Sequence, residues 1–110
     1  MHVSVAKESD RIRLKNGRVY MSGDFLYIHK AVMADHPGAI LQFRVTQRDL
    51  DRFRVEIIPG QGSVEAGEKH FGHLMKKQFG ADIQIAFERV TAIEREPSGK
   101  LRYFISELQK

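Results

Sequence analysis

Residues 41–58 read LQFRVTQRDLDRFRVEII and decide the fold of this chain. Apolar side chains occupy every second position from Leu41 to Val45 and again from Phe53 to Ile57. A period of two is typical of strands that bury one face. The polar residues 47–51 between the two runs predict a turn, so the strands most simply form an antiparallel pair.

Helical patterns lie on both sides of this strand pair. Residues 25–35 gather apolar side chains on one helical face after the cap residues 22–24, and His36-Pro37-Gly38 predicts the end of that helix. Residues 64–79 form a second such pattern, which ends at Gly80. We therefore expect two helices, one before and one after the strand pair.

Two features near the second helix resemble ligand sites but lack the full patterns. The glycine-rich residues 59–63 match neither the dinucleotide fingerprint nor the P-loop, so they predict a linker with Ser63 as N-cap. His70 and His73 lie three residues apart, but no Glu or Cys partner completes a metal-binding set. The sequence predicts no metal site.

The two ends of the chain predict hairpins. Asn16-Gly17 lies between alternating runs within residues 11–21, which is a strong hairpin signal. Residues 83–93 and 103–108 predict strands that close a C-terminal hairpin around the intervening loop. The expected fold is therefore an α+β two-layer sandwich: hairpin, helix, antiparallel strand pair, helix, strand and C-terminal hairpin.

Composition limits the classes of function. The chain has 110 residues, no cysteine and a net charge of +4, which suits one domain without disulfides, thiolate chemistry or cysteine zinc sites. No apolar run is long enough to span a membrane, and residues 1–10 lack the apolar core of a signal peptide, so we expect a cytoplasmic protein. We expect residues 1–9 to be a flexible lead-in and residues 10–110 to be the domain.

One loop near the C-terminus could carry chemistry. Pro97, Ser98 and Gly99 are turn-forming residues, and they place Lys100 at the tip of the predicted hairpin. Judged from these residues alone, Lys100 is either a solvated turn residue or a cation positioned for function.

Three segments, in this order, resemble a known family. They are Asn16-Gly17-Arg18-Val19, His36-Pro37-Gly38 leading to Gln42-Phe43-Arg44-Val45-Thr46-Gln47, and Ile93 to Tyr103 with its Pro-Ser-Gly-Lys motif. Over about residues 10–108 the chain is similar to the C-terminal domain of adenylate-forming (AMP-binding, acyl-CoA synthetase-like) enzymes. The resemblance is closest to the phenylacetate-CoA ligase and capsular-polysaccharide-biosynthesis branch.

The resemblance implies a mobile lid on a larger N-terminal adenylation domain. That domain would hold ATP, Mg²⁺ and the carboxylic acid substrate, and the isolated chain would be inactive. The loop lysine, here Lys100 beside Gly99, would enter the active site during adenylation. The lid would then rotate for thioester or acyl transfer, with coenzyme A as a possible acceptor.

Two further residues follow from the resemblance. The family's hinge signature is Gly-Arg-x-Asp, whereas this chain has Lys7-Glu8-Ser9-Asp10, which leaves Asp10 as the candidate hinge. Arg18 either contacts coenzyme A phosphate after lid rotation or is a solvated turn arginine.

Two other classes of function stay open. A small-molecule-sensing regulatory domain could dimerise through an edge strand. A nucleic-acid-binding α+β module could use Tyr20, Phe43 and Tyr103 as stacking platforms, although aromatic residues make up only 9% of the chain and most alternate as core residues would. The lid interpretation involves no nucleic acid and no membrane span.

Overall fold

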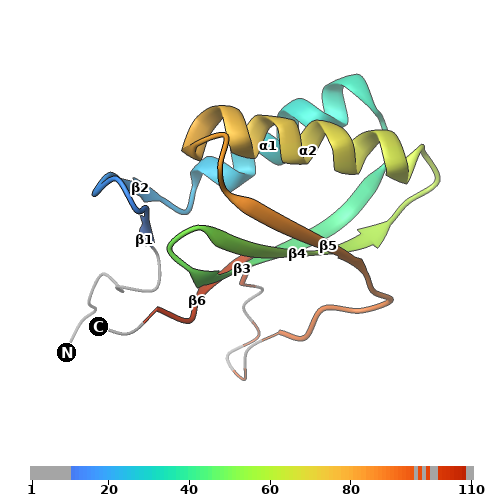
Figure 1. Ribbon diagram of the computed structural model, residues 1–110. Coiled ribbons are helices and arrows are strands. Elements are labelled where there is room, and N and C mark those ends of the chain that lie inside the picture. The colour runs from blue at the N-terminus through green and yellow to red at the C-terminus, as the bar shows by residue number, and fades with distance from the viewer. Residues whose placement is uncertain (1–10, 96, 98, 100–101, 109–110) are drawn as a thin grey trace.

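The computed structural model describes residues 11–95, 97, 99 and 102–108. Helices α1 (Asp24–Asp35) and α2 (Val64–Phe79) lie side by side over one face of a four-stranded sheet (Figure 1). That sheet contains β3 (Ile40–Asp49), β4 (Arg52–Pro59), β5 (Gln84–Arg89) and β6 (Phe104–Ser106). A separate two-stranded sheet contains β1 (Arg11–Arg13) and β2 (Val19–Met21). The predicted α+β class is confirmed.

The central pair of the main sheet is β3 with β4, and it is antiparallel as predicted. Phe43 lies opposite Ile57, and Val45 lies opposite Val55. All four side chains are buried beneath the helices. The prediction that Leu41 shares this face was wrong, because a bulge between Ile40 and Gln42 shifts the register and leaves Leu41 63% exposed.

The helices have the predicted bounds to within one residue and bury the expected faces. Phe25, Ile28 and Val32 point inward from α1, and Phe71, Met75 and Phe79 point inward from α2. Ser63 caps α2 by accepting a hydrogen bond from the amide of Ala66 at 3.4 Å. The aromatic rings meet across the layers, with Phe71 5.4 Å from Phe43 between ring centroids.

The N-terminal hairpin forms about Asn16-Gly17 as predicted and packs against one end of the domain. Ile12 is fully buried, and the ring of Tyr20 lies edge-on to Phe79 at 5.2 Å. The fully buried Gln47 of β3 donates from Nε2 to the carbonyl of Arg13 at 2.6 Å. This hydrogen bond joins the small sheet to the main one.

The predicted C-terminal hairpin was wrong. The strand order is β5-β4-β3-β6, so the last two strands occupy opposite edges of the sheet, and each is parallel to its neighbour. The helical connection through α2 returns β5 to the outer edge of β4. The strand β6 then pairs with the free edge of β3. Its residue Phe104 is 3% exposed and stacks on Phe25 with ring centroids 5.5 Å apart.

The glycine-rich linker before α2 lets two backbone segments approach closely. The amide of Gly62 donates to the carbonyl of Gly38 at 3.0 Å, and the amide of Gly60 donates to the carbonyl of Ala39 at 3.2 Å. A Cβ atom on Gly62 would lie 2.3 Å from the carbonyl oxygen of Pro37. These two linker amides are therefore engaged within the fold.

Gly62→Ala tests this close approach. We expect the free energy of unfolding to fall by about 1–3 kcal/mol, because the added methyl group must displace backbone atoms rather than a flexible side chain. Gly23→Ala is the control, since its Cβ meets nothing within 4 Å and its φ is −58°. That variant should change stability by no more than about 0.5 kcal/mol. Equal urea denaturation midpoints for the two variants would contradict the packing argument.

Candidate functional site

The connection from β5 to β6 carries the candidate site. Its described residues after β5 leave one edge of the sheet and pass on the side opposite the helices, and β6 lies at the other edge (Figure 1). Backbone hydrogen bonds hold both of its ends. The amide of Val90 donates to the carbonyl of Ile57 at 2.8 Å, and the carbonyl of Tyr103 accepts from the amide of Val45 at 2.8 Å.

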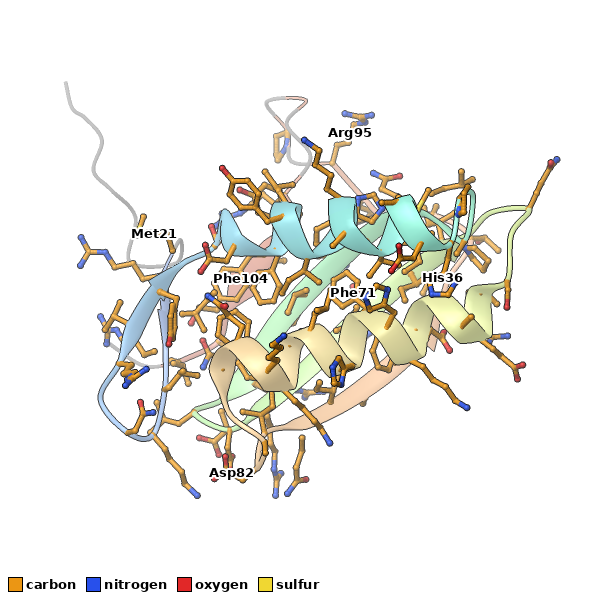
Figure 2. All side chains as sticks on the ribbon, turned by 90° about the horizontal axis from the view of Figure 1, so that it is seen from above. Met21, His36, Phe71, Asp82, Arg95 and Phe104 are labelled. Atoms are coloured by element: carbon orange, nitrogen blue, oxygen red, sulfur yellow. The ribbon has the colours of Figure 1, made fainter. Side chains whose placement is uncertain are left out.

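The connection has its own anchors between these ends. Ile93 is only 8% exposed, although it lies outside the main core cluster beneath the helices. Further along, Nη1 of Arg95 donates to the carbonyl of Gly99 at 3.3 Å and closes a short loop. Arg95 lies beyond α1 when the helix layer is viewed from above (Figure 2).

Gly99 is the one predicted site residue of this loop that the structure describes. Its φ is +90°, a conformation that residues with a Cβ rarely adopt, and a Cβ there would meet nothing within 4 Å. The glycine is therefore required by backbone geometry rather than by crowding. Lys100 lies outside the described residues, as does the candidate hinge residue Asp10.

Arg18 lies in the turn of the N-terminal hairpin, away from this loop. The hairpin turn adjoins the β3–β4 turn, where Nζ of Lys15 contacts a carboxylate oxygen of Asp51 at 3.2 Å. The guanidinium of Arg18 is exposed and donates to Oη of Tyr20 at 3.4 Å. This hydrogen bond and the Coulombic interaction with Tyr20 raise the pKa of Arg18 above its ordinary value. The structure does not bring Arg18 and Gly99 together.

A row of ion pairs lies on the sheet face that the helices leave open. A carboxylate oxygen of Glu56 accepts from Nε of Arg44 at 2.8 Å, and the other accepts from Nη2 of Arg54 at 3.3 Å. The same nitrogen of Arg54 contacts Glu88 at 2.9 Å. Glu56 is 8% exposed, although no helix covers it. This row was not predicted from the sequence, although opposite charges at paired strand positions are a signal that would have indicated it.

Glu56→Gln tests whether this row supports the open face. The substitution removes the shared negative charge between two guanidinium groups, so we expect a loss of about 1–2 kcal/mol in the free energy of unfolding.

Glu107→Gln is the matched control, because its contact with Arg48 is 3.5 Å long and about half exposed on both sides. We expect the control to change stability by no more than about 0.5 kcal/mol. If thermal unfolding shows that Glu107→Gln lowers stability as much as Glu56→Gln does, the ion-pair row does not stabilise the open face more than an ordinary surface ion pair.

The aromatic residues considered as base-stacking platforms each pack against another aromatic ring of the domain. Phe43 is 4% exposed, and Tyr103 packs against it with ring centroids 6.0 Å apart. Tyr20 packs against Phe79. The buried ring of Phe43 is not available for stacking on nucleic acid bases, and the half-buried rings of Tyr20 and Tyr103 each contact a core phenylalanine.

The described residues also bear on metals and membranes. They contain no group of three or more His, Cys, Asp or Glu residues that could hold a metal ion. Among them His73 is exposed, and Nδ1 of His70 lies 3.8 Å from a carboxylate oxygen of Asp35. In the same part of the chain, no helix is long and apolar enough to cross a membrane.

Comparison with known proteins identifies one family. Residues 15–107 match the family model described as the CapK C-terminal domain. No curated protein and no solved structure matches the chain. The matched range contains the ion-pair row, both helices and the connection from β5 to β6.

Proposed function

The chain belongs to the CapK C-terminal domain family, and we propose that it is the mobile lid of a larger ATP-dependent, AMP-forming acid ligase. The observation that carries the proposal is the family match across the loop with the Pro-Ser-Gly-Lys motif. A C-terminal domain implies a larger partner domain. In this proposal that partner is an N-terminal adenylation domain, joined through a hinge at Asp10.

Lys100 has the central chemical role in the proposal. Adenylation concentrates negative charge on the α-phosphate and on the departing pyrophosphate. A lysine brought next to that charge stabilises the transition state more than the bound substrates. Because the lysine is carried by a loop on a separate domain, it can arrive for adenylation and leave for the transfer step.

The described geometry supports such a loop without placing the lysine. Gly99 immediately precedes Lys100 and is exposed, and its carbonyl is held by Arg95. On the other side of the lysine, the carbonyl of Tyr103 accepts a hydrogen bond from the amide of Val45 in β3, and its ring packs on Phe43. The described residues on both sides of Lys100 are therefore attached to the rest of the fold.

ATP and Mg²⁺ belong to the partner domain in this proposal. Mg²⁺ prefers an octahedral set of oxygen ligands, often one or two carboxylates with phosphate oxygens, so it would be bound together with the nucleotide. Arg18 remains a candidate contact for the phosphates of coenzyme A, on a face of the domain separate from the lysine loop.

Lys100→Ala in the complete enzyme tests the proposal. We expect adenylate formation to slow by roughly 10²–10³-fold, which is the usual effect of removing one preorganised charge-stabilising group. The second half-reaction, started from synthetic acyl-adenylate, should keep its rate, because the lysine acts only in the adenylation orientation. Single-turnover kinetics measure the two steps separately.

Lys30→Ala is the control for this experiment, because Lys30 is exposed on α1. It should leave both steps unchanged. Loss of both steps in Lys100→Ala would indicate a docking defect, and loss of neither would identify Lys100 as a solvated turn residue.

The isolated chain should bind ATP only weakly. A single loop lysine cannot replace the concave site that a nucleotide and its metal need. Titration calorimetry with MgATP should therefore show no micromolar binding. Micromolar affinity would argue for a ligand-sensing domain instead of a lid.

A further inference from the structure

The two helices leave a groove between them on the surface that faces away from the sheet. Its volume is about 500 Å³. Asp24, Tyr27, Ile28 and Ala31 of α1 line one wall, and Leu74, Lys77 and Gln78 of α2 line the other. At one end of the groove, Nε2 of Gln78 donates to a carboxylate oxygen of Asp24 at 3.1 Å, so this carboxylate already has a partner. Ile28, Ala31 and Leu74 give the groove an apolar floor, and Tyr27 is 74% exposed at its rim. Figure 2 looks down on the helix layer that contains it.

A basic stripe runs along α2 beside this groove. The stripe consists of Lys69, His73, Lys76 and Lys77, all of which are exposed. Lys69, His73 and Lys76 follow one another at steps of four and three residues, and Lys77 lies four residues after His73, which places all four on one side of the helix. Among the described residues, no carboxylate lies within 4.0 Å of the three lysines. The acidic residue nearest to the stripe in sequence, Glu68, is already paired with Arg89 at 3.1 Å.

We propose that the groove and the basic stripe together dock an acidic amphipathic helix of a partner protein. Apolar side chains spaced at i, i+3 or i+4, and i+7 would fill the groove against Leu74 and Tyr27. Carboxylates on the flank of the same helix would meet Lys77 and the rest of the stripe. This docking role goes beyond the lid function and does not depend on Lys100.

Two other occupants fit the surface less well. A second copy of this chain docked by the same face would bring one basic stripe against another, which like charges oppose. A flat anionic membrane is met best by protruding apolar side chains, whereas this groove is concave and has Ile28 and Leu74 in its walls. The concave shape favours the side-chain row of a helix.

The test uses a synthetic 18-residue helical peptide with leucines at the i, i+3, i+4 and i+7 positions and glutamates on the flanks. Titration of the 110-residue chain, followed by fluorescence anisotropy of the labelled peptide, should show saturable binding that weakens with added salt. Lys77→Glu should weaken the binding about five-fold or more. Ala31→Phe, which fills the groove at constant charge, should do the same.

Arg52→Glu is the matched control, because it makes the same change of charge at an exposed site on β4. It should alter the affinity by less than two-fold, and circular dichroism should show that all three variants fold. Equal losses for Lys77→Glu and Arg52→Glu, no effect of Ala31→Phe, or no binding at all would each overturn the proposal. Tighter binding to phosphatidylserine vesicles or to a single-stranded oligonucleotide than to the peptide would also overturn it.

Discussion

The antiparallel pairing of β3 with β4 is the constraint on which the rest of the domain depends. Its register aligns Phe43 with Ile57 and Val45 with Val55 on one face, and hydrophobic burial there holds both helices. Because side chains alternate along a strand, the same register sends Arg44 and other charged residues to the opposite face. One face is therefore a core, and the other is a polar surface.

This division explains where the candidate site lies. The helical connection through α2 places β5 beside β4, and the last strand completes the sheet beside β3. The described part of the connection between those edges lies on the side of the polar face, where Glu56 pairs with two arginines. The loop before Lys100 thus belongs to a segment fixed at both ends to the two central strands. The outer surface of the helix layer stays free for a different role.

Local signals allowed most of the fold to be predicted from the sequence. The Asn16-Gly17 hairpin, both helices and the central strand pair depend on turn chemistry and on periodicity within short windows. The C-terminal hairpin was predicted wrongly because β6 pairs with β3, which is distant in sequence, and not with the preceding strand. Likewise, the exposure of Leu41 depends on a bulge that alternation alone does not reveal.

The candidate site was predictable only in part. The turn residues around Gly99 indicated a constrained loop, and its positive φ agrees with that prediction. The attachment of the connection to β4 and β3 depends on long-range contacts of Val90 and Tyr103, and the hydrogen bond from Arg95 to Gly99 depends on a side-chain orientation that turn signals do not reveal. Gln47 shows the same limit: it was assigned to a polar turn, yet it is fully buried and hydrogen-bonded to the N-terminal hairpin.

A change of lid orientation is the most direct test of the central claim. The chain has no native cysteine, and Glu94 is exposed in the connection, so Glu94→Cys offers a unique labelling site within this domain. Electron–electron resonance can measure its distance to a second label near the nucleotide site of the complete enzyme. We expect a short distance with ATP and the acid, and a longer distance with acyl-adenylate and the acceptor. A single distance that does not change between the two conditions would contradict the lid function.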